Sequence, residues 1–248
     1  MSLDLPDFTR KVILELKSTK DYFGDLANRL GFPLSINNTG EVIAFTDFSD
    51  GLWNTFTSGS GAGWSYELTS KNYCTGGFAL EMTSGSALTG FAYSTLMSPF
   101  LGLLKYGFEV RFSSSSALKY IDFALYFNYL AETNFFHLRY KIADQSFYVL
   151  DNGIWRKILT LAFPLASLSP ALNVLKFIGD SATKKYDNLI INGQEVDLSM
   201  YSSTIDVPSV FSRVTGMFRI MTEGGVGSTV YLDSMILTKN ENITVIIP

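Results

Sequence analysis

Short apolar and aromatic runs recur along most of the chain, and the pattern changes at residue 40. After that residue the runs follow one another at intervals of about 8–15 residues, with scarcely any helical periodicity. They cover residues 41–45, 64–68, 78–82, 90–95, 106–112, 119–129, 134–140, 147–150, 173–178, 189–196, 216–221 and 229–237. Such a series predicts about a dozen strands, and therefore an all-β jelly-roll β-sandwich over residues 41–240.

Two dipeptides mark tight hairpins. Asn152-Gly153 and Asn192-Gly193 each stand between two β-prone runs. Both central residues of a type I′ turn need a positive φ, which asparagine and glycine tolerate, so we predict a hairpin at each position. The glycine- and serine-rich stretch 57–63 is instead interpreted as a flexible connection between strands.

Residues 1–40 have a different pattern and are predicted to form an N-terminal arm. Residues 8–17 have the β-branched, partly alternating character of a strand. Ser18 is a candidate N-cap for a short helix, whose apolar stripe runs from Tyr22 to Leu30 and which Gly31 ends. A lone strand and a short helix are marginal by themselves, so we expect the arm to dock on a neighbouring subunit.

The C-terminal tail, residues 241–248, contains five β-branched residues in succession, from Ile243 to Ile247. A free segment of this kind is a sticky edge that proteins normally cover. We therefore expect the tail to add a strand to a sheet edge of its own sandwich or of an adjacent subunit.

Composition narrows the function classes. The chain has 248 residues, of which 47% are hydrophobic and 17% charged, so it holds ample apolar material for an ordered core. Its net charge of −4 argues against a nucleic-acid-binding protein. No window approaches eighteen uncharged apolar residues, so we expect no membrane span, and the N-terminus, with its early acids, does not resemble a secretory signal.

Catalytic chemistry has little support in the residues. A sandwich glycosidase needs two facing carboxylates, but Glu81, Glu109 and Asp122 occur singly in β-prone runs. We expect each to face solvent or to pair with Arg111 or Lys119.

The single histidine and the single cysteine add no catalytic constellation. His137 lies in a β-prone run, and the chain contains no Gly-x-Ser-x-Gly elbow, so we expect this histidine to be packed or hydrogen-bonded within the sandwich. Cys74 is interpreted as an inert thiol. No catalytic residue is predicted.

Three segments carry a resemblance to a known family. The run 48–53 with its Asp-Gly-Leu-Trp, the strand motif Thr75-Gly-Gly-Phe-Ala-Leu-Glu-Met82 and the closing run Thr229-Val-Tyr-Leu-Asp233-Ser-Met-Ile-Leu237 resemble jelly-roll carbohydrate-binding modules of the concanavalin-like type. The arm, with Pro6-Asp-Phe-Thr-Arg-Lys-Val-Ile-Leu-Glu15, looks like those of virion-associated proteins of tailed phages.

The resemblance implies two kinds of site. In such modules a structural Ca²⁺ often joins the first strand to the last, and Asp47 or Asp50 together with Asp233 match those positions. Sugar binding uses exposed flat rings. The tryptophans Trp53, Trp64 and Trp155 are therefore the candidate ligand-binding residues, with Trp155 the most exposed because it follows a turn.

The leading hypothesis is a non-enzymatic virion structural protein, a capsid or tail decoration that assembles through its arm and tail. Its expected partners are copies of itself and other virion proteins, such as a major capsid protein. The alternative is a carbohydrate-binding module, extracellular or at the cell surface, that recognises a glycan through exposed aromatic residues.

Overall fold

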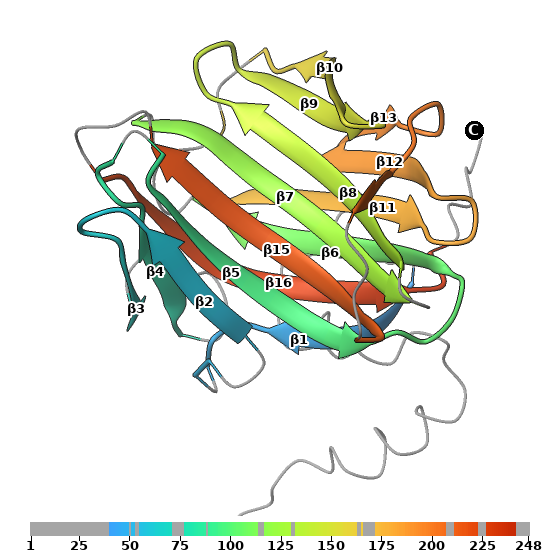
Figure 1. The fold of residues 1–248 in the computed structure, drawn as a ribbon. Coiled ribbons are helices and arrows are strands. Elements are labelled where there is room, and N and C mark those ends of the chain that lie inside the picture. The colour runs from blue at the N-terminus through green and yellow to red at the C-terminus, as the bar shows by residue number, and fades with distance from the viewer. Residues whose placement is uncertain are drawn as a thin grey trace, which may run out of the picture.

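The structure is a computed structural model, and it describes residues 40–49, 51–52, 55–70, 77–87, 89–113, 117–129, 132–162, 165, 172–206, 211–222 and 227–241. In these residues the chain forms two stacked antiparallel sheets of eight strands each, so the predicted all-β sandwich is confirmed (Figure 1). None of the described residues forms a helix that could cross a membrane. The arm, the tail beyond Glu241 and Cys74 lie outside the described residues.

The back sheet of the view in Figure 1 contains the last strand of the described chain. Its order is β13 (Gln194–Asp197), β12 (Lys185–Ile191), β11 (Asn173–Asp180), β6 (Lys105–Phe112), β16 (Thr229–Lys239), β4 (Ala79–Thr83) and β3 (Ser65–Thr69), and β1 (Glu41–Thr46) also pairs with β16. Because β1 pairs with β16, the first and last described strands lie side by side in this sheet.

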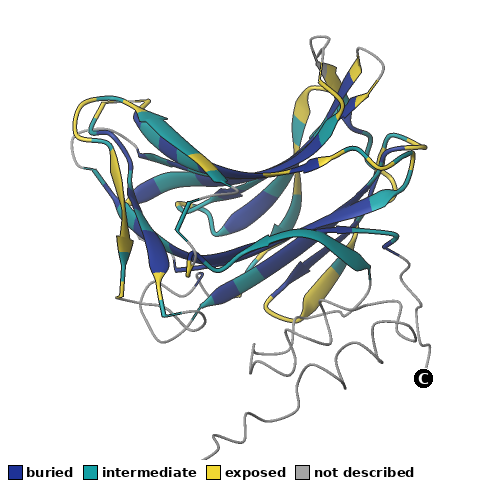
Figure 2. Ribbon diagram, turned by 90° about the horizontal axis from the view of Figure 1, so that it is seen from below, coloured by how far each residue is buried: buried dark blue, intermediate teal, exposed yellow. Residues whose placement is uncertain are grey.

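The front sheet lies nearest the viewer in Figure 1. Its order is β10 (Ile154–Thr160), β9 (Ser146–Asp151), β8 (Glu132–Lys141), β7 (Leu118–Tyr129), β15 (Arg213–Thr222), β5 (Phe91–Pro99) and β2 (Thr55–Ser60), and β14 (Thr204–Asp206) also pairs with β8. Figure 2 shows that this sheet is curved and that its outer face is concave, with the edge strands on the two raised sides. We call this surface the concave face.

Alternation along each strand sends one set of side chains into the core and the other to the sheet surface. On β7, Phe123 and Phe127 point between the sheets and are buried. The ring of Phe123 lies 5.4 Å from that of Phe112 on the back sheet, and Phe218 packs 5.2 Å from Phe112. The core is therefore an aromatic layer contributed by both sheets.

Both predicted hairpins are confirmed. Asn152 and Gly153 have φ values of 47° and 83° and join β9 to β10. Asn192 and Gly193 have φ values of 49° and 85° and join β12 to β13. The sequence therefore located these turns through backbone geometry that few other residue pairs adopt.

The interpretation of residues 57–63 as a flexible connection was wrong over its first half. Residues Thr57–Ser60 belong to β2, which pairs along β5 from Leu96 to Phe91. Gly59 has a packing role, because a Cβ there would lie 2.7 Å from the ring of Trp64. The glycine thus allows an aromatic side chain to approach an edge strand, and pairing with β5 overrides the turn-like composition.

Candidate functional site

A groove of about 580 Å³ crosses the concave face between β2, β5, β15 and β7. It is lined by Phe56, Tyr93, Thr95, Met97, Tyr126, Asn128, Arg213, Thr215 and Met217. The groove combines aromatic rings with hydroxyl, amide and guanidinium groups, a composition typical of small-molecule binding sites.

Strand register explains why these side chains share one surface. Directly opposed residues of antiparallel strands point to the same face of the sheet. Phe56 of β2 is opposite Thr95 of β5, which is opposite Met217 of β15. The next row joins Met97, Thr215 and Tyr126 in the same way. The groove is therefore built from residues more than 150 positions apart in the chain.

The aromatic residues of the groove present their rings at different inclinations. Phe56 is 54% exposed, and its ring centroid lies 6.1 Å from that of Tyr93 at an interplanar angle of 48°. Tyr126 stacks on Phe135 with centroids 4.6 Å apart, which fixes its ring. Two half-buried tyrosines and one largely exposed phenylalanine thus form preorganised apolar surfaces.

Polar groups lie between the rings. The carbonyl of Asn128 accepts a hydrogen bond of 2.8 Å from Thr133, which orients the amide and leaves its nitrogen as a donor. Among the described residues, Thr215 Oγ1 and Arg213 Nε have no hydrogen-bond partner, although both residues line the groove. Both atoms are buried, so they are unsatisfied polar groups beneath the groove surface and not contacts that a ligand meets directly.

A buried charged cluster lies beside the groove on the same face. Asp122 of β7, 1% exposed, accepts hydrogen bonds from Arg139 Nε at 2.7 Å and from Arg219 Nε at 3.0 Å. His137 Nε2 lies 3.5 Å from Asp122 Oδ2. Burial alone would raise the pKa of Asp122, but His137 and the two guanidiniums hold the pKa of this carboxyl well below its usual range. Asp122 is therefore ionised at neutral pH.

The histidine of this cluster is buried, as the sequence predicted. His137 is 4% exposed and its ring packs against Phe135 and Trp155. Burial lowers the pKa of His137, and the neighbouring Asp122 carboxylate only partly opposes that effect. The imidazole is consequently neutral near pH 7.

The two candidate tryptophans that the structure describes lie apart. Trp155 lies towards the β10 edge of the concave face, with the Arg139 guanidinium 4.3 Å from its ring centroid. Trp64 stacks on Tyr66 next to the edge strand β3 of the back sheet. Trp53 lies outside the described residues. Trp155 alone of the described pair therefore shares the concave face with the groove.

The candidate calcium ligands are partly outside the described residues. Asp47 Oδ1 accepts hydrogen bonds from the backbone N–H and the hydroxyl of Ser49, and Asp233 is fully buried in β16. Asp50 is outside the described part of the chain. Within that part, no group of three or more histidine, cysteine or acidic side chains is placed to hold a metal ion. Any calcium site here would rely on backbone carbonyls and water for most of its ligands, and it stays a prediction.

The structure shows the ion-pair partners of two acids, Glu109 and Asp122. Glu109 is buried and lies 3.4 Å from Arg111, so that pair is confirmed. The partner expected for Asp122 was wrong, since Arg139 and Arg219 hold it instead of Arg111 or Lys119. Neighbouring strands supply these arginines through cross-strand register, which nearness in the sequence does not reveal.

Sequence reasoning missed the groove residues Phe56, Tyr93 and Tyr126. Alternation in 91–97 and 119–129 places Tyr93 and Tyr126 on the face of each strand that points away from the core. That signal identifies a surface-facing aromatic. Which strands lie side by side, however, depends on the fold of the whole chain.

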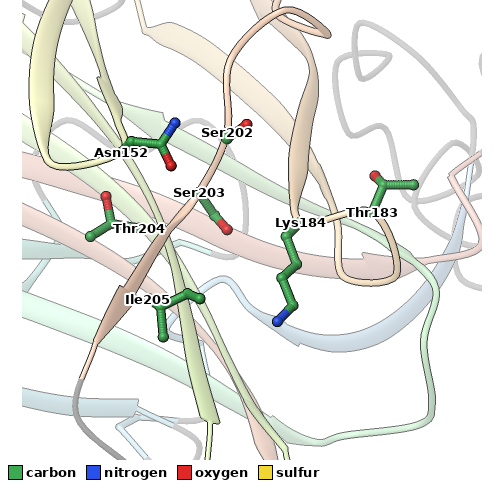
Figure 3. Close-up of a pocket in the computed structure, with 7 residues that line it drawn as sticks. All are labelled: Asn152, Thr183, Lys184, Ser202, Ser203, Thr204 and Ile205. Carbon is green, nitrogen blue, oxygen red and sulfur yellow. The ribbon is translucent and has the colours of Figure 1, made fainter.

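A second, smaller pocket of about 350 Å³ lies near β14 and two turns, at the residues labelled in Figure 3. Ser203 and Thr204 line one side and Thr183 and Lys184 the other (Figure 3). The ammonium of Lys184 is paired with Glu132 at 2.7 Å, and the lining includes no aromatic ring. This pocket therefore lacks the flat apolar surfaces of the groove.

No protein-family model matches the chain, and a search of curated proteins finds no match. Among solved structures, a glycosidic hydrolase is similar with a TM-score of 0.51 and 11% identity, over 80% of this chain and 95% of that one. The cellulose induced protein Cip1 is similar with a TM-score of 0.50 and 11% identity, over 78% and 96% of the two chains. A carbohydrate esterase from the Shiga toxin-encoding bacteriophage phi24B covers 82% of this chain and 100% of its own at 15% identity, with a TM-score of 0.49.

These identities are low, so the likeness concerns the fold alone. The glycosidic hydrolase and Cip1 align over nearly their full lengths with the two-sheet architecture described above. The resemblance of the sequence motifs to concanavalin-like β-sandwiches is thereby confirmed at the level of the fold.

Proposed function

We propose that the protein binds a carbohydrate in the groove of the concave face. The observation that carries this proposal is the alternation of Phe56, Tyr93 and Tyr126 with hydroxyl, amide and guanidinium groups on one hollow surface. A pyranose has apolar C–H faces and a hydroxyl edge, so it needs both kinds of group from its receptor. Aromatic rings supply the flat apolar contact, and the polar side chains supply orientation.

The contribution of Phe56 can be worked out from its exposure. Its 54% exposure leaves on the order of 100 Å² of ring surface in solvent, taking an aromatic side chain as about 200 Å². If a sugar covers half of that area, burial contributes about 1.3 kcal/mol at 25 cal/mol per Å². Loss of the ring should then weaken binding by about tenfold.

The experiment is a binding screen followed by substitution. Neutral and charged polysaccharides are tested by affinity electrophoresis, and those that retard the protein are titrated calorimetrically as oligosaccharides. Phe56→Ala should weaken the dissociation constant by about tenfold. Phe78→Ala is the matched control because Phe78 is 43% exposed and precedes β4 of the back sheet.

The outcomes separate clearly. Equal weakening by the two substitutions would place binding elsewhere than in the groove. Failure of every polysaccharide in the screen to bind would refute the proposed function.

The virion structural role stays a prediction beside this one. It depends on the arm of residues 1–40, which lies almost wholly outside the described residues. A sugar-binding groove on the sandwich and an arm that contacts other subunits are compatible, because they use different parts of the chain.

A further inference from the structure

The concave face carries an excess of positive charge on a protein that is acidic overall. By strand register, Arg139, Lys141, Lys157, Arg213 and Arg219 lie on this face. The acids beside them are Asp122 on the same face, Asp206 of β14, which is opposite Thr133, and Asp144 in the turn after β8, 3.8 Å from Lys141. Among the described residues of this face, five cations against three acids leave two positive charges, whereas the whole chain has a net charge of −4.

The outer face of the back sheet shows a different arrangement. Buried or half-buried cations there lie against acids, Lys105 against Asp187, Arg111 against Glu109 and Lys176 against Glu241. The positive excess is therefore a property of the concave face and not of the sandwich as a whole.

The centre of this excess is rigid. One carboxylate, Asp122, serves two guanidiniums, with Arg139 donating from Nε at 2.7 Å and Nη2 at 3.1 Å and Arg219 from Nε at 3.0 Å. The side chains of Arg139 and Arg219 are 20% and 24% exposed. A guanidinium has five N–H donors, so each arginine keeps donors beyond those that Asp122 accepts.

Aromatic rings fix the plane of one of these arginines. The guanidinium carbon of Arg139 lies 4.4 Å from the ring centroid of Tyr120 and 4.3 Å from that of Trp155. Cation–π contacts of this kind hold the side chain without neutralising its charge. The arginine is thus preorganised to meet an anion, and little side-chain entropy remains to be lost on binding.

The charged centre is continuous with the groove. Tyr93, which lines the groove, is directly opposite Arg219 on the neighbouring strand, and Arg219 is directly opposite Asp122. A ligand that packs against Tyr93 and continues along this row of residues would meet Arg219 and then Arg139. At the other end of the groove Arg213 supplies a further cation.

We propose that the glycan bound on the concave face is anionic, a polysaccharide that carries carboxylate or sulfate groups. This inference rests on the proposed function and specifies its ligand class. Guanidinium groups recognise carboxylate and sulfate oxygens through paired N–H donors, and the Asp122-held arginines offer such donors at a fixed position beside the aromatic rings.

The test compares matched polymers that differ in charge. Polygalacturonate is compared with its methyl-esterified form, and cellulose sulfate with hydroxyethyl cellulose, by affinity electrophoresis and titration in 50 and 200 mM salt. We expect at least tenfold tighter binding of the anionic member of one pair, weakened by salt, and the two pairs separate carboxylate from sulfate recognition.

Substitutions assign the effect to the concave face. Arg219→Gln and Lys157→Gln should each reduce the preference for the anionic polymer severalfold, and Lys157 is exposed, so its replacement leaves the fold intact. Lys185→Gln, an exposed lysine of β12 in the back sheet, is the matched control and should change nothing.

Three results would overturn the inference. Equal affinity for charged and neutral polymers, weakened in both cases by Phe56→Ala, would keep the carbohydrate function and reject the anionic ligand. An anionic preference reduced equally by Lys157→Gln and Lys185→Gln would reveal nonspecific attraction. Absence of binding to all four polymers and to the wider screen would refute both proposals.

Discussion

Removing the charge of Asp122 should destabilise the fold strongly at neutral pH. Asp122→Asn keeps the shape of the side chain but leaves one acceptor oxygen and places an amide NH₂ against a guanidinium. The native carboxylate is 1% exposed and accepts hydrogen bonds from both Arg139 and Arg219. Breaking a buried ion pair from one side costs about 3–5 kcal/mol. Because the guanidiniums reach solvent, we expect the lower end, about 3 kcal/mol.

The loss of stability caused by Asp122→Asn should depend on pH. The folded-state pKa of Asp122 is held well below the ordinary value near 4. The stabilisation that depends on its ionisation is therefore fully present above about pH 4 and is lost as pH falls through the folded-state pKa. At pH 3, about one unit below the ordinary pKa, the difference in stability between the native protein and Asp122→Asn should be about 1 kcal/mol smaller than at pH 7. The reason is that one pH unit changes the free energy of unfolding by at most about 1.4 kcal/mol per proton.

Urea unfolding at pH 7 and pH 3 measures both effects. Asp187→Asn is the control, since Asp187 pairs with Lys105 at 3.0 Å but is 21% exposed, and its loss should cost under about 1 kcal/mol. If Asp122→Asn costs no more than Asp187→Asn at pH 7, or if its cost is the same at both pH values, the role assigned to the buried carboxylate is wrong.

Four further outcomes are expected. Since burial lowers the pKa of His137, the free energy of unfolding of the native protein should decrease as pH falls below about 6.5. In His137→Gln the free energy of unfolding, measured with urea, should depend less on pH in this range. An unchanged pH dependence would contradict a buried neutral imidazole. In Gly216→Ala the new Cβ would lie 2.3 Å from the Phe108 ring, so the free energy of unfolding should drop by about 1–3 kcal/mol, and an unaltered urea midpoint would refute this tight packing. If Asp233 helps to hold calcium, chelation should lower the melting temperature of the native protein but not that of Asp233→Ala. A melting temperature that changes neither with chelator nor with added calcium would leave no role for the ion. Deleting residues 1–40 should leave a folded sandwich of smaller oligomeric size by light scattering; an unchanged size would remove the arm from assembly, and unfolding would assign it to the core.

Local signals in the sequence were sufficient for the strands and turns. The Asn-Gly pairs at 152–153 and 192–193 predicted hairpins because the required backbone conformation is a property of those residues themselves. The apolar and aromatic run 119–129 likewise predicted a strand buried on at least one face, which is β7.

Features that depend on distant segments were not accessible in the same way. Residues 57–60 have the composition of a turn, yet they pair with β5 about 35 positions away. The arginines that hold Asp122 are 17 and 97 positions along the chain, and only the order β5–β15–β7–β8 brings them together. The candidate site follows from this strand order. Of the two predicted tryptophans that the structure describes, Trp155 lies on the concave face and Trp64 does not.

Backbone amide chemical-shift mapping tests the central claim most directly. The protein labelled with ¹⁵N is titrated with the oligosaccharide that binds best in the screen, and the shift changes are followed strand by strand. Binding in the groove predicts the largest changes on β2, β5, β15 and β7, around Phe56, Tyr93 and Tyr126, with β3 and β4 of the back sheet unmoved. Changes concentrated on the back sheet, or none at saturating ligand, would contradict carbohydrate binding on the concave face.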